Sequence, residues 1–131
     1  MNIEVMQQAL HQSEAGKLTF PQVIAMLTAE GIEGYYKDLM RHEVTYYLAD
    51  GRTHTEPLTL PSAAIPEEFS ADNVVAAIRG AQRDEIRYPV FIERAIQAGT
   101  AAYRVCFTGK RAVYLGRKGE VHVEHFPQPK A

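Results

Sequence analysis

The sequence predicts an α+β fold in which an ααβββ unit occurs twice. Segments with helical spacing of apolar residues are followed by β-type segments separated by tight-turn signals, and this order then restarts midway along the chain. With 131 residues, the chain has the length of one domain. We therefore expect one compact pseudo-twofold domain, built from repeats 3–58 and 71–126 that are joined by the proline-bearing linker 57–69.

Two helices are expected at the start of the first half. Apolar residues recur there at helical spacing, glycine ends each segment, and Thr19 with Gln22 matches a capping box at the start of the second helix. Three β-type segments follow, and Asp50-Gly51 is a tight-turn signal between the second and the third. The elements predicted for this half are helices 3–15 and 19–31 and strands 35–40, 44–48 and 53–58.

The second half repeats this order from Ser70 onward. Pro89 is placed in the first turn of its second helix, and Lys118-Gly119 takes the place of Asp50-Gly51. The predicted elements are helices 70–82 and 88–99 and strands 103–107, 112–116 and 121–126.

The two halves align without a gap at an offset of 68 residues. The identical pairs include turn glycines, a helix-start proline, two tyrosines and a His-x-Glu pattern. They are Ala9/Ala77, Pro21/Pro89, Ile24/Ile92, Gly31/Gly99, Tyr35/Tyr103, Tyr46/Tyr114, Gly51/Gly119, His54/His122 and Glu56/Glu124. Since a unit of roughly 60 residues buries too little surface to be stable alone, we expect the two units to share a core.

Composition excludes several classes of protein. The net charge is −2, so nothing global points to nucleic acid or to an acidic membrane. The start of the chain lacks the pattern of a signal peptide, and the longest apolar run is far too short to cross a bilayer. We expect a cytoplasmic protein without membrane contact. The single cysteine, Cys106, is expected to be a small buried apolar residue, because no nucleophile signature surrounds it.

Two His-x-Glu pairs are the candidate polar sites: His54 with Glu56, and His122 with Glu124. Residues two apart on a strand point to the same side, so we expect the second pair to face away from Val121 and Val123. Four such groups could hold Zn²⁺ or Fe²⁺ if the two strands lay side by side. If the strands lie at opposite edges, each pair is a solvated surface feature without metal, and this second arrangement is the prediction.

A basic segment is the third candidate. It comprises Arg104, Lys110, Arg111, Arg117 and Lys118. With interleaved tyrosines it could contact a nucleic-acid backbone or a phosphorylated ligand. The alternative is that turn lysines and arginines serve solubility. Six tyrosines fall in predicted strands, where the margin of the core is the expected place: Tyr35, Tyr36, Tyr46, Tyr47, Tyr103 and Tyr114.

Several stretches resemble a known family. They are "FPQVIAMLTAEGIEGYYKDL", "TYYLADG", "YPVFIERAIQAG", "YRVCF" and "AVYLGRKGEVHVEHFP". The resemblance is to the YbcV-like family of small bacterial proteins of unknown function, sometimes labelled "phage envelope protein", and it covers nearly the whole chain. Many members of that family carry a cysteine in the helix that matches "YPVFIERA". This chain has none there, so the resemblance implies no nucleophile.

A non-enzymatic binding or interaction module is the function favoured by these observations. We expect a homodimer, and an unknown partner protein or small-molecule ligand at the junction of the two halves. No cofactor and no catalytic residue is predicted, because phosphate-binding, zinc-protease and hydrolase motifs are missing from the sequence. The alternatives are a small metal-assisted enzyme that uses the His-x-Glu strands and a nucleic-acid or phosphate-ligand binder that uses segment 104–118.

Overall fold

The pairing of two strands from different halves of the chain organises the structure. In the computed structural model, which describes residues 2–127, β1 (Ile32–Asp38) pairs antiparallel with β4 (Thr100–Cys106). β2 (Glu43–Leu48) and β3 (Thr53–Pro57) extend the sheet from β1; β5 (Arg111–Gly116) and β6 (Val121–His125) extend it from β4. The order of the six strands is therefore β3-β2-β1-β4-β5-β6. Every neighbouring pair is antiparallel, and β3 and β6, at the two ends of this order, are the edge strands.

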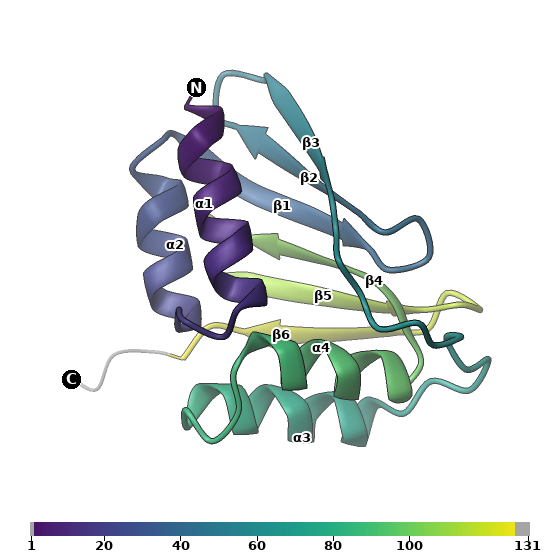
Figure 1. Cartoon of the computed structure of the whole chain (residues 1–131). Helices are drawn as coiled ribbons and strands as arrows, with labels where there is room; N and C mark the ends of the chain where they lie inside the picture. Colours follow the sequence, from purple (N-terminus) through teal and green to yellow (C-terminus); the bar gives the residue numbers. More distant parts are fainter. Residues whose placement is uncertain (1, 128–131) are drawn as a thin grey trace.

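Four helices form the second layer of the molecule. They are α1 (Ile3–Glu14), α2 (Phe20–Thr28), α3 (Ala71–Gln82) and α4 (Tyr88–Gln97). α1 packs beside α2, and α3 packs beside α4; the two pairs meet where α1 contacts α4 (Figure 1). The α+β class and the element order are confirmed, since each half of the chain contains two helices followed by three strands.

One hydrophobic cluster lies between the two layers and includes residues from both halves. The inner face of the sheet contributes its buried tyrosines, and the helices contribute aliphatic side chains such as Met6, Leu27 and Ile96. The outer face carries no helix, so its residues are more exposed; Val121 and Val123, on edge strand β6, are 56% and 41% exposed. None of the described helices is both long and apolar enough to span a membrane.

Local signals placed most of the elements correctly. The predicted capping box is present: Gln22 N donates to Thr19 Oγ1 and Thr19 N donates to Gln22 Oε1. The strand predicted at 35–40 instead ends at Asp38, whose carboxylate accepts hydrogen bonds from Met40 N and Arg41 N. This turn, which the Asp38 side chain stabilises, starts the β1–β2 connection two residues before the predicted end of the strand.

The connection between the halves is attached to the core. Leu58 and Ile65 are buried, and Phe69 packs against the hydrophobic cluster. Ser70 N donates to Ala98 O at 2.8 Å, and the Ser70 side chain caps α3. At Gly99, with φ of +93°, a Cβ atom would lie only 2.1 Å from Glu68 O. Gly31 has a similar φ of +78°, but its Cβ would meet nothing within 4 Å.

Gly99→Ala should therefore be much more destabilising than Gly31→Ala. Both variants force alanine into a left-handed backbone conformation, at a cost of about 1–2 kcal/mol. Only Gly99→Ala must also displace the backbone at Glu68, so we expect it to lower the free energy of unfolding by at least ~1 kcal/mol more. Urea unfolding of both variants measures the difference. Equal losses would show that the linker does not press on α4 in this way.

Candidate functional site

The main cavity lies between the sheet and the place where the two helix pairs meet. Its volume is about 360 Å³, and residues of all four helices line it. Most of its lining is apolar or aromatic, with Leu27, Ile78 and Phe91 among the contributors. Cavities of this size and character, with a small number of polar groups, are typical small-molecule sites.

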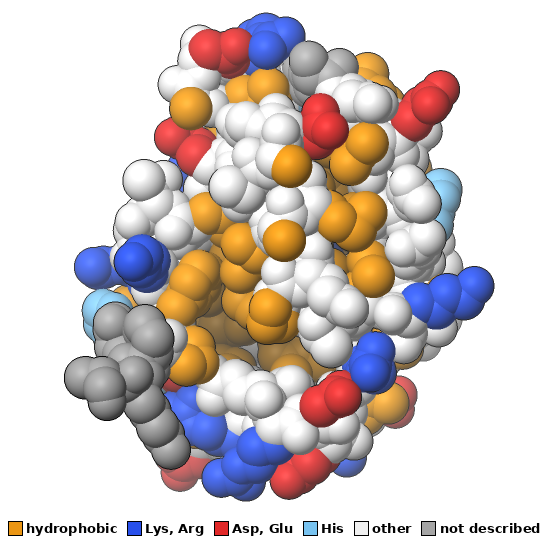
Figure 2. Space-filling view, turned by 90° about the vertical axis from the view of Figure 1, so that its left-hand side faces the viewer, with side chains coloured by type: hydrophobic (Ala, Val, Ile, Leu, Met, Phe, Trp, Pro, Cys, Tyr) orange, Lys and Arg blue, Asp and Glu red, His pale blue; other side chains and the backbone are white. Residues whose placement is uncertain are grey.

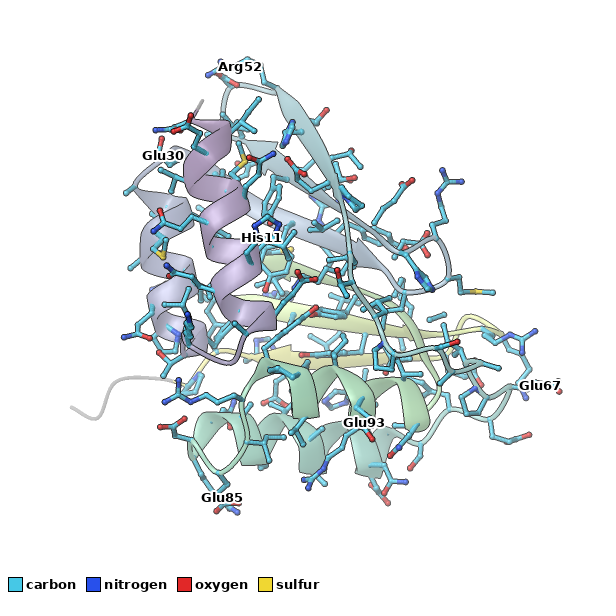
Figure 3. All side chains as sticks on the ribbon, viewed as in Figure 1. His11, Glu30, Arg52, Glu67, Glu85 and Glu93 are labelled. Carbon is cyan, nitrogen blue, oxygen red and sulfur yellow. The ribbon has the colours of Figure 1, made fainter. Side chains whose placement is uncertain are left out.

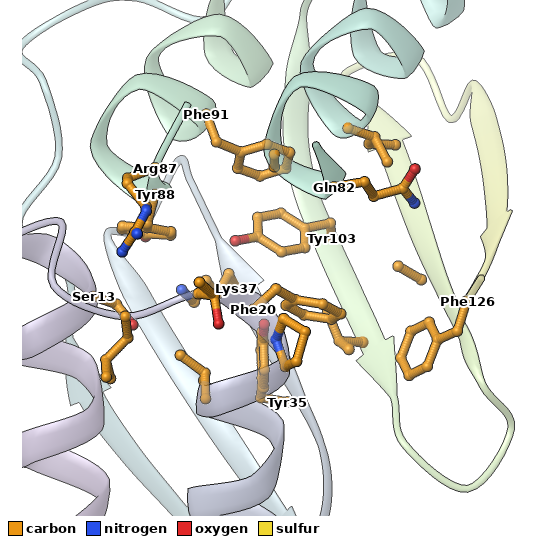
Figure 4. Close-up of a pocket in the computed structure, with 18 of the residues that line it drawn as sticks. Ser13, Phe20, Tyr35, Lys37, Gln82, Arg87, Tyr88, Phe91, Tyr103 and Phe126 are labelled. Atoms are coloured by element: carbon orange, nitrogen blue, oxygen red, sulfur yellow. The ribbon is translucent and has the colours of Figure 1, made fainter. Parts of the chain in front are cut away.

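Lys37 is the one lysine among the residues that line this cavity. It lies on β1, opposite Tyr103 of β4, and shares the inner face of the sheet with Tyr35. Its residue is only 6% exposed. In Figure 4 the Lys37 side chain lies between Ser13 of α1 and Tyr88 of α4, within the layer of aromatic rings. Lysine is almost never this buried unless it is paired, so its surroundings are informative.

Lys37 Nζ has aromatic neighbours rather than an acidic partner. It lies 4.1 Å from the centroid of the Tyr88 ring and 5.3 Å from that of Tyr35. Within residues 2–127, no carboxylate forms a salt bridge with it, and Glu14 acts on it only at longer range. Burial lowers the pKa of Lys37 to about 7, and the Glu14 charge only partly opposes this change. Near neutral pH the amine therefore exists both with and without its extra proton.

A second polar group without a partner, the Tyr88 hydroxyl, belongs to a residue that lines the cavity. Its hydroxyl oxygen is buried, and no described residue forms a hydrogen bond with it. Burial raises the pKa of Tyr88, and the charge of Glu14 acts in the same direction. A hydrogen-bonding interaction with the Tyr103 side chain opposes the rise, although the two hydroxyls do not meet the geometric criteria for a hydrogen bond. A buried hydroxyl without a partner needs an explanation, and a bound molecule is one.

The cavity opens on the side of the molecule where α2 and the end of β6 lie. Figure 2 shows hydrophobic side chains gathered around a hollow on that side. Phe20 of α2 and Phe126, which follows β6, both line the cavity and pack edge to face with ring centroids 5.6 Å apart. Phe20 is 40% exposed. At the rim, the Arg87 guanidinium bonds to Asp84 and to Gly16 O.

The two His-x-Glu pairs form similar short networks under the helices. His54 Nε2 lies 2.6 Å from Glu56 Oε1, to which Gln7 of α1 also donates. In the second half, His122 Nε2 lies 3.3 Å from Glu124 Oε1, and Arg79 of α3 donates to this carboxylate at 2.8 Å. For each carboxylate, burial tends to raise the pKa, but the hydrogen bonds outweigh it and lower the pKa of Glu56 and of Glu124.

The prediction that these pairs are solvated surface features is wrong. Both carboxylate side chains are only 14% exposed, and they lie on the inner face of the sheet. His122 and Glu124 do face away from Val121 and Val123, as predicted. However, the face that carries the two valines is the exposed one. The physical reason is that Gln7 and Arg79 satisfy the carboxylates beneath the helices, so a polar pair tolerates the covered side.

Strand order keeps the two pairs apart. His54 and Glu56 are on β3, His122 and Glu124 are on β6, and four strands separate these two edges. The condition for one metal held by both pairs is therefore not met. Within residues 2–127, no three histidine, cysteine or acidic side chains are grouped closely enough to hold a metal ion.

The basic segment does not form one patch. Arg104 and Arg111 lie on strands, whereas Lys110 lies in the β4–β5 turn. Arg117 and Lys118 lie in the turn at the other end of β5, where Arg117 donates to Ile65 O and Lys118 approaches Glu68. Figure 3 shows that other charged residues, such as Arg52, Glu67 and Glu85, also point away from the body of the molecule at widely separated places.

Cys106 and the strand tyrosines differ from their predicted burial. Cys106 is a free thiol and only half-buried, so its predicted burial is wrong; it pairs with Gly34 on β1, which gives it no side chain to pack against there. All six tyrosines lie in strands, as predicted. Four of them are buried rather than marginal: Tyr35, Tyr46, Tyr103 and Tyr114.

Lys37 was missed by the sequence reasoning, although a signal existed. It lies two residues from Tyr35, so it shares a face with a residue whose counterpart, Tyr103, is identical. At the same offset of 68, Lys37 corresponds to Val105, which is buried. A lysine at a position where the other half has a core valine indicates a buried charge.

Comparison of the chain with models of protein families and with curated protein sequences finds no match.

The buried amine should make stability depend on pH. In the unfolded chain the lysine pKa is near 10.5, and the fold lowers it to about 7. Between these values the unfolded state binds more protons, so the free energy of unfolding rises with pH by up to about 1.4 kcal/mol per unit from this group. Below pH 7 both states are protonated and the full penalty of burying the charge remains. Lys37→Met should abolish this slope, measured by urea unfolding from pH 6 to 9.5.

Lys17→Met provides the matched control for this measurement. Lys17 is exposed after the end of α1, so its removal should leave the pH profile parallel to that of the unmodified protein. A Lys37→Met profile parallel to both would contradict a lowered pKa for Lys37.

Proposed function

We propose that this protein binds a small molecule in the cavity between the two helix pairs, and that Lys37 is the polar anchor of the site. The ligand would have an apolar, partly aromatic body and one oxygen that accepts hydrogen bonds. The observation that carries the proposal is a lysine amine that lines a cavity of about 360 Å³ without an acidic partner among the described residues. This agrees with the expected ligand site at the junction of the two halves.

The kinds of group in the cavity indicate the chemistry of the ligand. The aromatic and aliphatic walls favour an apolar body through the hydrophobic effect. Among the polar groups at the cavity, Lys37 Nζ and Tyr88 Oη are hydrogen-bond donors. A carboxylate or carbonyl oxygen would accept a hydrogen bond from Lys37 Nζ, whereas a cationic ligand would place like charge beside the protonated amine.

Binding of 3-phenylpropionate, which has an aromatic body and a carboxylate, tests this proposal. The chain has no tryptophan, so Phe20→Trp at the cavity mouth places a single fluorescent reporter there. We expect a saturable change in its emission with a Kd below about 1 mM. Since deprotonation of Lys37 removes the counter-charge, affinity should fall as pH rises through about 7.

Two variants separate binding in the cavity from contact with its mouth. In the Phe20→Trp background, Lys37→Met should weaken binding about tenfold or more, because a charge-assisted hydrogen bond is lost. Lys17→Met should leave binding unchanged. Saturable binding that is the same in all three proteins would show that Lys37 is not the anchor, and no binding of apolar acids at all would contradict the proposed function.

The two alternative functions have weaker support. A metal-assisted enzyme would need the His-x-Glu pairs to meet, but they occupy opposite edges of the sheet. A nucleic-acid site would need a continuous basic surface, but Arg104, Arg111 and the two basic turns are separated. Arg104 is also stacked on the Tyr47 ring, 4.7 Å from its centroid, which occupies one aromatic side chain that could otherwise stack on a base.

We also propose that the chain is an internal duplication with a pseudo-twofold axis between β1 and β4. The register supports this, because Tyr36 pairs with Arg104, its own counterpart at the offset of 68. Tyr35 pairs with Tyr46 in one half and Tyr103 with Tyr114 in the other. Superposition of residues 3–58 on 71–126 tests the proposal, and a different strand direction or register in the two halves would contradict it.

The homodimer and the YbcV-like family remain predictions. The outer face of the sheet is the surface we propose for a dimer, because Val121 and Val123 are exposed there beside Val113 and Leu115 of β5. One chain has a mass of 14.7 kDa, and light scattering at high micromolar concentration should give twice this mass. A single-chain mass would contradict the dimer.

A further inference from the structure

We infer that Lys37 is a covalent capture site for aldehydes, in which Nζ forms an imine with the carbonyl carbon of a small aromatic or aliphatic aldehyde. This inference rests on the proposed function, since the aldehyde must first enter the same cavity. It goes further, because it assigns a reaction to the amine and selects one class among the ligands that could accept a hydrogen bond from it.

The position of the amine provides what imine formation needs. Nζ lies at the cavity rather than in bulk water, and the residue is 6% exposed. No described carboxylate forms a salt bridge with it, so no ion pair has to break before the nitrogen lone pair is available. Buried lysines without an ion pair are the ones that serve as Schiff-base residues.

The reaction balances without any other reactant. The lone pair of uncharged Nζ attacks the aldehyde carbon and forms a C–N bond, while one N–H proton passes from nitrogen to the carbonyl oxygen, which becomes a hydroxyl group. This carbinolamine then loses the hydroxyl group together with the second N–H proton as water, and a C=N bond forms. The net change is aldehyde plus amine to imine plus water. Because Lys37 is only 6% exposed, bulk water has little access to the imine, which disfavours its hydrolysis.

Aromatic rings hold the reacting atom in place. The Tyr88 ring lies against Nζ at 4.1 Å, and the Tyr35 and Tyr103 rings lie at 5.3 and 5.9 Å. These rings also stabilise the charge of a protonated amine or a protonated imine through cation–π contact. The Tyr88 hydroxyl oxygen is buried and has no hydrogen-bond partner among the described residues, so the contribution of Tyr88 at Nζ comes from its ring.

Titratable groups from several elements are packed around the amine. Those groups are Glu14 of α1, Arg87 and Tyr88 at the start of α4, Tyr35 on β1, Tyr46 on β2 and Tyr103 on β4. The buried tyrosines have raised pKa values and stay neutral, which leaves Glu14 as the group that opposes deprotonation of Lys37. A substantial share of the amine is therefore uncharged at neutral pH.

Reductive trapping with 3-phenylpropanal tests the inference. The full chain is incubated with the aldehyde and cyanoborohydride at pH 7, which converts an imine to a stable secondary amine, and the modified lysine is located by peptide mass mapping. We expect one adduct per chain, with the mass of the aldehyde less one water plus two hydrogens, on Lys37. It should form at least ~10 times faster than adducts on the exposed residues Lys17, Lys110 and Lys118, because only Lys37 among these lysines lines the cavity that binds the aldehyde.

Two comparisons make the outcome decisive. Lys37→Met should lose the fast adduct, whereas Lys17→Met should keep it. The matched alcohol, 3-phenylpropan-1-ol, is titrated against the Phe20→Trp reporter, since it can bind but cannot form an imine. Suppose that the alcohol or the phenylpropionate binds, but the aldehyde labels the exposed lysines at least as fast as it labels Lys37. In that case the inference is overturned and the proposed function stands. If none of the three compounds binds and Lys37 is not labelled, both are overturned.

Discussion

The antiparallel pairing of β1 with β4 is the contact on which the rest of the structure depends. It joins the two halves of the chain into one sheet and makes β3 and β6 the edges. It also brings the two helix pairs together over the middle of the sheet, where they leave the cavity. Lys37 lies at this junction because its strand partner is Tyr103, from the other half.

Burial of Lys37 is costly, and the cost is local to the cavity. Removal of an ammonium group from water without an ionic partner disfavours its charged form, which is why the pKa falls to about 7. Nearby carboxylates do not offset this cost as they do elsewhere, for example where Arg79 bonds to Glu124 at 2.8 Å. Positions with unpaired polar groups in an otherwise apolar cavity are typical of functional sites, where stability is lower than an apolar residue would give.

Much of the fold could be predicted because its signals are local. The capping box at Thr19, the Ser70 cap and the glycine turns depend on a few adjacent residues, and each is present. Which side of β3 and β6 is covered by the helices could not be predicted in the same way. His122 and Glu124 are covered because Arg79, 43 residues earlier than His122, donates to the carboxylate, and a partner on another element leaves no trace in the strand pattern.

The candidate site escaped prediction for a related reason. A cavity is formed by elements that are far apart in the sequence, such as Ser13, Lys37 and Phe126, and no spacing rule links them. What the sequence did contain was one irregularity, a lysine where the other half has the buried residue Val105.

The most direct test is a measurement of the pKa of Lys37 itself. Titration of the ¹³Cε resonances in protein labelled at lysine reports each amine separately. The structure requires one resonance, missing in Lys37→Met, that titrates near pH 7. If the Lys37 resonance instead titrates near the ordinary lysine value of about 10.4, the amine has found a counter-charge or open water, and the account of an unpaired amine in the cavity is wrong.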